Sequence, residues 1–516
     1  MGIEFWDNLR PLTEQFPHLW SQMQSNISGP TQLIRDTVCQ GTIYQPTSES
    51  LALSAGRINC PLSPSQQTAL NLCLASSPLF VLEGVRGSGK RRIAQLLSEI
   101  IIRHQKKLLL LTRYPGSLQA YENLPGIVCP IVATSQPKWL QNHLRQQYLG
   151  QTRMDFLPIY LQSDPLLAEL RSPRRLEYWL SLLNSSISGK ELIEKLKLEF
   201  PGSSISRIKL LAHRLKKSIP LLKLQLWLSQ KAVQLSEASV NELANRLEQS
   251  GQLTFTGTIK NYMQTERYSL QESLFDWTIV IEAEELTWLE LMLVAGRTKK
   301  LILMGNLSAQ HLVRQPFSDQ NPFFWLGEFL SPAYRYRLHE QFRLHHLISQ
   351  PVYKALYNRW VHTHTTTSPL TLPQLTARLQ WQDIPGQVEQ SVNAWEGNQI
   401  LTFLQRFQIS LMTEIGILTF SPAQRDWFNE HLTSQFHAVK VGAIPEWAGQ
   451  ERRIMMLSCG SNPKIISSDE LAIALTRARD YLILFGDFRV WQEARTPLQQ
   501  ILMSQDIQRE REVVLA

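Results

Sequence analysis

A glycine-rich turn between an apolar segment and an amphipathic one constrains the fold of this chain more than any other feature. Residues 79–82 have the length and unbroken apolar character of a buried strand, and the turn GVRGSGK follows at residues 84–90. Apolar residues then recur at the spacing of one helical face between residues 93 and 100, before a second apolar run at residues 108–111. A strand, a turn, a helix and a strand in this order predict a parallel α/β sheet.

The turn fits the phosphate-binding pattern G-x-x-x-x-G-K-[ST] at every position except the last. Gly84, Gly89 and Lys90 match, but Arg91 takes the place of the hydroxyl residue that contacts magnesium in such loops. A turn that follows a strand and opens a helix presents backbone N–H groups to a phosphate. ATP is therefore a candidate ligand, although a guanidinium has no lone pair to offer a metal ion.

Composition limits the class of protein. A chain of 516 residues exceeds one ordinary core, so we expect two or three domains. No apolar run reaches 18 residues and the N-terminus lacks the pattern of a secretory signal, so we expect a cytoplasmic protein without membrane spans. The five cysteines form no C-x-x-C pair, which argues against a zinc ribbon. The net charge of +8 suits a polyanionic partner.

The spacing of strand-like and helix-like segments predicts two α/β domains. We expect an N-terminal extension over residues 1–60 and a first domain built from residues 61–130 and 265–330. A basic helical insertion, residues 131–264, separates these two parts. The second domain follows over residues 331–516, with the strand-like runs IGILTF, RRIMMLSC and DYLILFGD.

The insertion is strongly basic. Between Arg171 and Lys231 it carries thirteen Lys or Arg residues against four Asp or Glu residues. Clustered cations displace counterions from a nucleic acid, whereas the alternative is the solvated face of packed helices. The residues that we expect to contact a nucleic acid are Arg174, Arg175, Lys209, Arg214, Lys216 and Lys217.

Six further segments follow in a fixed order: FDWTIVIEAEE, LHEQFRLHHLI, VNAWEGNQIL, IGILTFSPAQ, VGAIPEWAGQERRIMMLSC and LAIALTRARDYLILFGD. Together with the glycine-rich turn they resemble the motifs of superfamily 1 helicases, closest to the Upf-like and senataxin-like branch. The resemblance extends over residues 61–500 apart from the insertion. It implies two RecA-like domains with ATP in the cleft between them, and single-stranded DNA or RNA bound across the top.

The same resemblance implies roles for individual residues. Glu282 occupies the position of the carboxylate that orients the attacking water, and Arg343 and Arg477 occupy those of the two arginine fingers. Gln66 is similar to the glutamine that reads the adenine edge. The nucleotide-binding positions that the resemblance implies are Gln66, Gly84, Gly87, Ser88, Gly89, Lys90, Arg91, Gln341 and Glu451.

The departures from the family pattern concern the magnesium ion. The family supplies a loop hydroxyl and the Asp of a D-E-A motif, and Arg91 and Ile281 stand at these positions. Neither can ligate a metal, and at an effective dielectric of about 20 two positive charges about 4 Å apart repel by roughly 4 kcal/mol. We therefore expect no protein metal site and impaired or absent Mg-ATP hydrolysis. Lys90 or Arg91 is expected to pair with a carboxylate of residues 282–285 instead.

Three interpretations remain open at this point. The first is a helicase-derived protein that binds nucleic acid without powered unwinding. The second is an active DNA or RNA helicase that holds its metal unconventionally, for example through Glu282 and water molecules. The third is a scaffold that docks a protein partner through the extension or the insertion.

Overall fold

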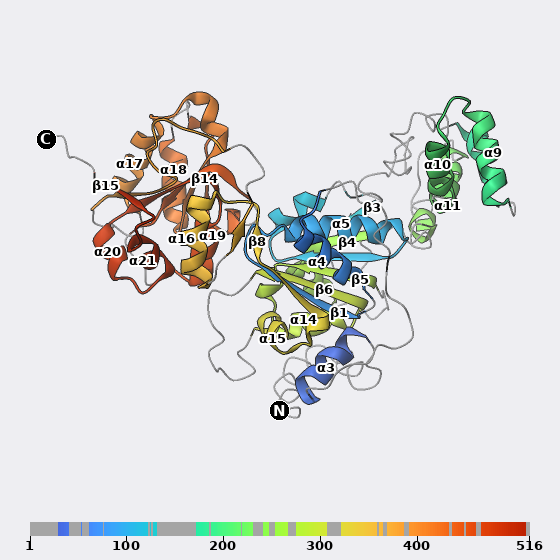
Figure 1. Cartoon of the computed structure of the whole chain (residues 1–516), viewed down its shortest axis with the longest axis horizontal. Coiled ribbons are helices and arrows are strands. Elements are labelled where there is room, and N and C mark those ends of the chain that lie inside the picture. Colours follow the sequence, from blue (N-terminus) through green and yellow to red (C-terminus); the bar gives the residue numbers. More distant parts are fainter. Residues whose placement is uncertain are drawn as a thin grey trace.

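Two parallel sheets flanked by helices form the body of the molecule, and a helical module lies beside the first of them (Figure 1). This architecture confirms the predicted fold class, two RecA-like α/β domains with a helical insertion in the first. The computed structural model describes residues 29–40, 53, 61–75, 77–121, 124, 127–131, 172–184, 187–217, 219–230, 241–246, 253–266, 275–306, 321–358, 361–364, 369–385, 392–432, 436–447, 450–460 and 466–511.

The first sheet has seven strands in the order β3-β4-β2-β5-β6-β1-β7, and every neighbouring pair is parallel. The strands are β1 (Leu79–Gly84), β2 (Leu108–Thr112), β3 (Ile127–Pro130), β4 (Leu253–Thr258), β5 (Phe275–Ile281), β6 (Thr298–Asn306) and β7 (Arg335–Leu338). Residues of β1 and β2 are buried throughout, as expected for apolar strands covered by helices on both faces.

Helices on both faces of this sheet create two hydrophobic cores. Leu109 and Leu111 of β2 face one core and Leu108 and Leu110 face the other, because successive strand residues point to opposite sides. The helical segments of this domain are α3 (Pro30–Gln40), α4 (Pro64–Leu74), α5 (Lys90–Arg103), η1 (Pro115–Tyr121), α13 (Ile259–Glu266), η3 (Ala283–Glu285), α14 (Trp288–Ala295), α15 (Pro322–Phe329) and η5 (Pro332–Tyr334).

The boundaries of the first domain differ from those predicted at two places. β4 was expected inside the insertion, but it lies between β3 and β2 in the sheet. Its sequence LTFTGT alternates polar and apolar residues, so it lacks the apolar run that marks the other strands. β7 was expected in the second domain, but it pairs with β1, and Arg337 forms an ion pair with Glu83 at 2.6 Å. β4 is an interior strand that its neighbours bury, whereas β7 is a partly buried strand at the edge of the sheet.

The second sheet has six parallel strands in the order β12-β11-β13-β14-β10-β15. These strands are β10 (Leu379–Asp383), β11 (Ile415–Thr419), β12 (Lys440–Ala443), β13 (Arg452–Ser458), β14 (Ala478–Gly486) and β15 (Gln508–Arg511). A two-stranded ribbon, β8 (Glu340–Gln341) and β9 (His362–Thr363), links the domains. The helical segments are α16 (His346–Tyr357), α17 (Ala394–Leu404), η6 (Ile409–Glu414), α18 (Pro422–His431), η8 (Ile444–Trp447), α19 (Ser468–Leu475), α20 (Phe488–Glu493) and α21 (Pro497–Leu502).

The insertion forms a helical module with its own core. Its helices are α8 (Pro173–Asn184), α9 (Gly189–Glu199), α10 (Ile205–Lys217) and α11 (Ile219–Gln230). Trp179 is buried in this core with Leu176, Leu192 and Leu211. Trp227 packs against a core of the first domain and so connects the module to it.

The described part of the N-terminal extension is α3 together with Gly29 and Leu53. Leu33 and Ile34 of α3 join the core that contains α14, which places this helix against the first domain. The remaining residues of the extension lie outside the described residues. Within the described ranges, no helix has the length and apolar character that a bilayer span requires.

Removal of a core side chain should destabilise the first domain. Leu110 is completely buried in the central strand β2, so Leu110→Ala should lower the free energy of unfolding by about 2–5 kcal/mol. Leu198→Ala, at a position 82% exposed, is the control and should change it by less than about 0.5 kcal/mol. Urea unfolding followed by circular dichroism measures both, and equal effects of the two substitutions would contradict the assigned core.

Candidate nucleotide site between the two domains

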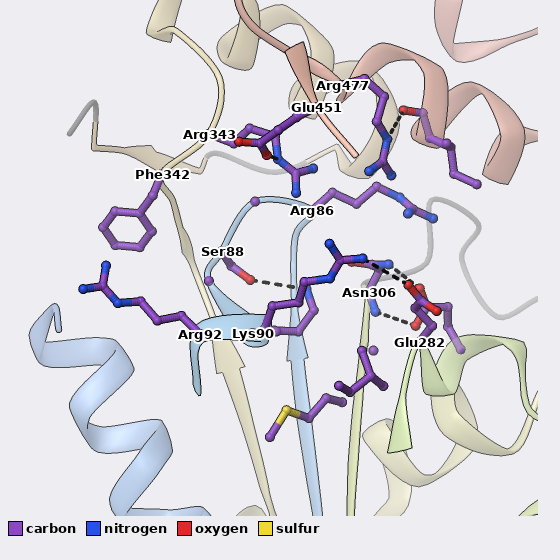
Figure 2. A pocket seen from close by; sticks show the side chains of 18 of the residues that line it. Arg86, Ser88, Lys90, Arg92, Glu282, Asn306, Phe342, Arg343, Glu451 and Arg477 are labelled. Atoms are coloured by element: carbon purple, nitrogen blue, oxygen red, sulfur yellow. Dashed lines mark hydrogen bonds and ion pairs between the residues drawn. The ribbon is translucent and has the colours of Figure 1, made fainter. Parts of the chain in front are cut away.

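A cavity of about 520 Å³ lies where the carboxyl ends of β1, β2, β5 and β6 face the second domain (Figure 2). Seven cationic side chains and four carboxylates line it. The cationic residues are Arg86, Lys90, Arg91, Arg92, Arg343, Arg477 and Arg479. The acidic residues are Glu282, Glu284, Glu285 and Glu451. The cavity therefore carries a surplus of positive side chains, which suits an anionic ligand.

The glycine-rich loop is closely packed between the two domains. Gly87 and Gly89 have φ angles of 88° and 86°, a left-handed conformation that glycine adopts without strain. A Cβ atom at Gly87 would lie 2.9 Å from Cβ of Arg343, and one at Gly89 would lie 2.2 Å from Nε2 of Gln66. The N–H of Phe342 also donates to the carbonyl of Gly87 at 2.9 Å. These positions require glycine because neighbouring side chains occupy the space.

The ammonium group of Lys90 is bonded to the loop itself. Its Nζ donates to the carbonyl oxygens of Gly84 at 2.8 Å and Val85 at 2.9 Å, and to Oγ of Ser88 at 3.3 Å. Burial lowers the pKa of Lys90 to about 7, and neighbouring guanidinium groups, that of Arg86 foremost, contribute to this shift. Burial is the largest cause of this shift, and the charge of Glu284 opposes it.

Arg91 occupies a network with the carboxylate expected to orient water. Its Nη2 atom donates to Oγ of Ser117 at 2.9 Å and lies 3.6 Å from Oε1 of Glu282. Ser117 donates to the same Oε1 at 2.6 Å, and the N–H of Tyr114 donates to Oε2 at 3.4 Å. The predicted pairing with a carboxylate is thus confirmed for Arg91. The described bonds of Lys90 go to the loop, so the structure does not pair Lys90 in this way.

The remaining acidic residues of this corner are also bonded to protein groups. Glu284 accepts hydrogen bonds from the backbone N–H of Asn306 at 3.0 Å and from its side-chain amide, and Glu285 accepts one from the hydroxyl of Tyr114 at 3.0 Å. Burial raises the pKa of Glu282 and of Glu285, with a further increase from the charge of Glu284. Burial therefore opposes ionisation of both carboxyls.

The side chains of this corner do not fit a magnesium ion. Mg²⁺ requires oxygen ligands in octahedral geometry. Ile281 ends β5 with a side chain that packs in a hydrophobic core, and Arg91 offers only donors. Among the described residues, no group of three or more His, Cys, Asp or Glu side chains is arranged to hold a metal ion.

The two arginines of the second domain are held by protein acceptors. Nε of Arg343 lies 2.6 Å from Oε2 of Glu451, and its Nη1 donates to the carbonyl of Thr476 at 3.2 Å. Arg477 is 3% exposed and donates from Nε to the carbonyl of Ile473 at 3.0 Å and from Nη1 to that of Gln450 at 3.2 Å. Both side chains line the cavity, but Glu451 pairs with Arg343.

The two glutamines expected to bind nucleotide lie behind the loop, not on the cavity wall. Gln66 belongs to the capping box of α4, where its Oε1 accepts from the N–H of Ser63, and its Nε2 donates to the carbonyl of Ser88 at 3.1 Å. Gln341 is completely buried and bonds the backbone of Arg343 and Leu344. Both amides therefore shape the loop and its neighbour. Of the other predicted positions, Gly87, Ser88, Gly89, Lys90, Arg91 and Glu451 line the cavity, whereas Gly84 does not.

The basic residues predicted to bind nucleic acid lie on α8 and α10, in the separate module. Arg174, Lys209 and Lys216 are exposed, whereas Arg175 pairs with Glu199 at 2.8 Å. The side chains of Arg214 and Lys217 lie outside the described part of the chain. Helix α10 contains no acidic residue.

Sequence reasoning missed several residues that line the cavity or contact its lining. The only sequence signal for a role of Arg86 in the cavity is that it is a charged residue inside a glycine-rich turn. Ser117 and Tyr114 follow the carboxyl end of β2, which places them beside Glu282, but nothing in their sequence context indicates the contact. The ring of Phe342 lines the cavity and stacks on His364 with a centroid distance of 5.1 Å.

Comparison with known proteins finds a family model that matches part of the chain. The AAA domain family matches residues 326–489, which supports the predicted resemblance over this part of the chain. Similar solved structures include the arterivirus nonstructural protein 10 helicase, with 10% identity, TM-score 0.33 and coverage of 79% of this chain and 59% of that one. The complex of an arterivirus nonstructural protein 10 helicase with DNA has 13% identity and a TM-score of 0.34, with coverage of 80% of this chain and 61% of that one. The PRRSV helicase has 10% identity and a TM-score of 0.31, with coverage of 79% of this chain and 52% of that one. The chain thus spans about three fifths of these structures or less, and no curated protein matches it.

The ion pair between Arg91 and Glu282 should be energetically coupled. A double-mutant cycle with Arg91→Gln and Glu282→Gln should give a coupling of about 0.5–1 kcal/mol, because the pair is partly buried but 3.6 Å apart. A cycle of Glu282→Gln with Arg103→Gln is the matched control. Arg103 lies about 18 Å further along α5 at 1.5 Å per residue, so it should show no coupling. Equal coupling in the two cycles, measured by urea unfolding, would refute the pairing.

Proposed function

We propose that this superfamily 1 helicase-like protein binds single-stranded DNA or RNA and hydrolyses Mg-ATP very slowly or not at all. The observation that carries the proposal is the ion pair between Arg91 and Glu282 at the magnesium corner of the cavity. Phosphoryl transfer depends on a metal ion that bridges the phosphates and on a positioned water molecule. Arg91 and Ile281 supply no ligand for the first, and the hydrogen bonds of Glu282 occupy the group that would serve the second.

The arginines support the same conclusion. An arginine finger stabilises charge on a transferring phosphoryl group only if its guanidinium is free to reach that group. Arg343 is paired with Glu451, and Arg477 donates to two backbone carbonyls. Turnover would therefore require both arginines to exchange protein acceptors for the nucleotide, in addition to a metal ion held without protein ligands at its two usual positions.

The helical module carries the proposed nucleic-acid contacts. Lys209 and Lys216 are exposed on α10, a helix with cations and no carboxylates. Side chains of this kind neutralise phosphates and release counterions without regard to base sequence. Arg175 contributes less, because Glu199 already pairs with it. The module lies apart from the two sheets, so its exposed faces are accessible to a long polyanion (Figure 1).

A protein-docking role is the second candidate. The same module exposes large apolar side chains, which are unusual on a helical face that contacts only water. The exposed fractions are 82% for Leu198, 56% for Ile205 and 48% for Leu210. Stable capture of a protein partner without any oligonucleotide binding at low salt would favour this role over the first.

The chain should lack magnesium-dependent ATP turnover. Phosphate release with ATP and Mg²⁺, with or without a single-stranded oligonucleotide, should equal that of a Lys90→Ala variant, because the metal has no protein ligand at either usual position. Release by the original chain that exceeds the variant and disappears on chelation would establish an active ATPase and refute the proposal.

Oligonucleotide binding should depend on α10 and on salt. Lys209→Gln together with Lys216→Gln should weaken binding and reduce the slope of log K against log salt by about 2, close to 1 for each phosphate that is no longer neutralised. Lys106→Gln, at an exposed lysine outside the helical module, is the control and should leave the slope unchanged. Fluorescence anisotropy across a salt series measures both, and an unaltered slope in the double variant would exclude α10 as the binding surface.

A further inference from the structure

We infer that the interdomain cavity binds a nucleoside triphosphate free of divalent cation, with the guanidinium of Arg91 in the role that magnesium has in related loops. The inference rests on the proposed function, because it concerns the same cavity and the same missing metal ligands. It goes further because it assigns a class of ligand to the cavity and predicts that magnesium lowers the affinity for that ligand.

The charge balance of the cavity favours a polyanion. Two of its four carboxylates already have a cationic partner: Glu282 pairs with Arg91, and Glu451 pairs with Arg343. Glu284 accepts its described hydrogen bonds from the neutral Asn306. Seven cations against four carboxylates leave a surplus of positive side chains in the cavity lining, and such a surplus in a partly enclosed site attracts anions.

Arg86 gives an independent indication of a ligand. Its Nε atom is buried and has no hydrogen-bond partner among the described residues. A buried donor without a partner is unfavourable, so such a group in a folded protein calls for a ligand or an ion. Figure 2 shows the side chain of Arg86 extending into the cavity between the loop and Arg477. A phosphate oxygen in the cavity would supply the missing acceptor.

The lysine of the loop points to the same ligand. Burial lowers the pKa of Lys90 to about 7. The negative charge of Glu284 opposes this shift, and the positive charges of Arg86, Arg343 and Arg91 add to it. An anion beside these groups would favour the charged form of Lys90. The backbone N–H groups at the start of α5 add further donors for a phosphate, as in other loops that open a helix.

The shape of the cavity accommodates a base as well as phosphates. Its volume of about 520 Å³ lies within the usual range for small-molecule sites. Phe342 and Arg92 lie at one end of it and Glu282 at the other (Figure 2). An aromatic ring at the end away from the acidic corner offers a stacking surface for a base, which favours a nucleotide over inorganic triphosphate.

Magnesium should oppose binding in this cavity. A divalent ion removes two negative charges from the ligand, and it would bring a cation to the corner that Arg91 already occupies. In a loop with a hydroxyl residue after the lysine, the magnesium ion gains a ligand. In this chain Arg91 has that position, so the ion meets a positive charge and is repelled. The sign of the magnesium effect therefore separates this cavity from that of an ordinary ATPase.

The test is calorimetric titration of the full chain with ATP and with inorganic triphosphate, in EDTA or in excess Mg²⁺. ATP should bind at least about tenfold more tightly in EDTA, a ratio that corresponds to about 1.4 kcal/mol. Arg91→Thr should weaken binding in EDTA by a similar factor and abolish the magnesium penalty. Arg91→Lys keeps the charge and should retain most of the affinity, which distinguishes loss of charge from misfolding. Arg103→Ala, exposed on the same helix, is the control and should bind as the original chain does.

The pH dependence gives a second readout. Lys90 loses its charge above a pKa of about 7, so affinity in EDTA should fall severalfold from about pH 7 to about pH 9. The last phosphate ionisation, near pH 6, acts in the opposite direction and cannot produce this fall.

Four outcomes overturn the inference: tighter binding with Mg²⁺, no binding of ATP in either buffer, unchanged affinity in Arg91→Thr, or equal affinity for ATP and inorganic triphosphate. Oligonucleotide binding and phosphate release, measured on the same samples, separate this inference from the proposed function. If ATP fails to bind while the oligonucleotide still does and no turnover occurs, only the inference falls. Magnesium-dependent turnover would refute both.

Discussion

Parallel pairing of apolar strands is the constraint on which the cavity depends. Because neighbours in the first sheet all run in the same direction, β1, β2, β5 and β6 end at one edge. The glycine-rich loop, Tyr114, Glu282 and Asn306 follow or end these strands and so meet there. The burial of the strands between helices fixes their register, and the register determines which polar groups become neighbours.

The acidic corner of the cavity is a self-contained polar network. Arg91, Ser117 and the N–H of Tyr114 all contact Glu282. Ile281 lines the cavity too, but its apolar side chain belongs to a hydrophobic core of the sheet. A metal ion and a guanidinium compete for the same carboxylate. The metal ion would need lone pairs of Glu282 that already accept from Ser117 and Tyr114 and face Arg91. Arg91 and Ile281 therefore have a joint effect. Arg91 stands in place of one metal ligand and pairs with Glu282, and Ile281 stands in place of the second ligand.

The sequence predicted the features that local patterns determine. The apolar runs identified β1, β2, β11, β13 and β14. The loop motif located the cavity, because strand burial and phosphate-loop geometry follow from residue type and spacing. β4 and β7 were assigned wrongly because neither has an apolar run of its own: β4 is buried by its neighbours, and β7 is a partly buried edge strand. The pairing of Arg91 with a carboxylate followed from charge alone. The roles of Arg86, Gln66 and Gln341 depend on side-chain direction in the assembled fold, which no spacing rule supplies.

The backbone of the glycine-rich loop is held by the second domain as well as the first. The hydroxyl of Tyr353 donates to the carbonyl of Arg86, and the N–H of Phe342 donates to that of Gly87. Gly87 also lies so close to Arg343 that even a methyl group would not fit. The two domains therefore share the backbone of this loop, so a ligand that altered the loop would also have to alter its contacts with the second domain.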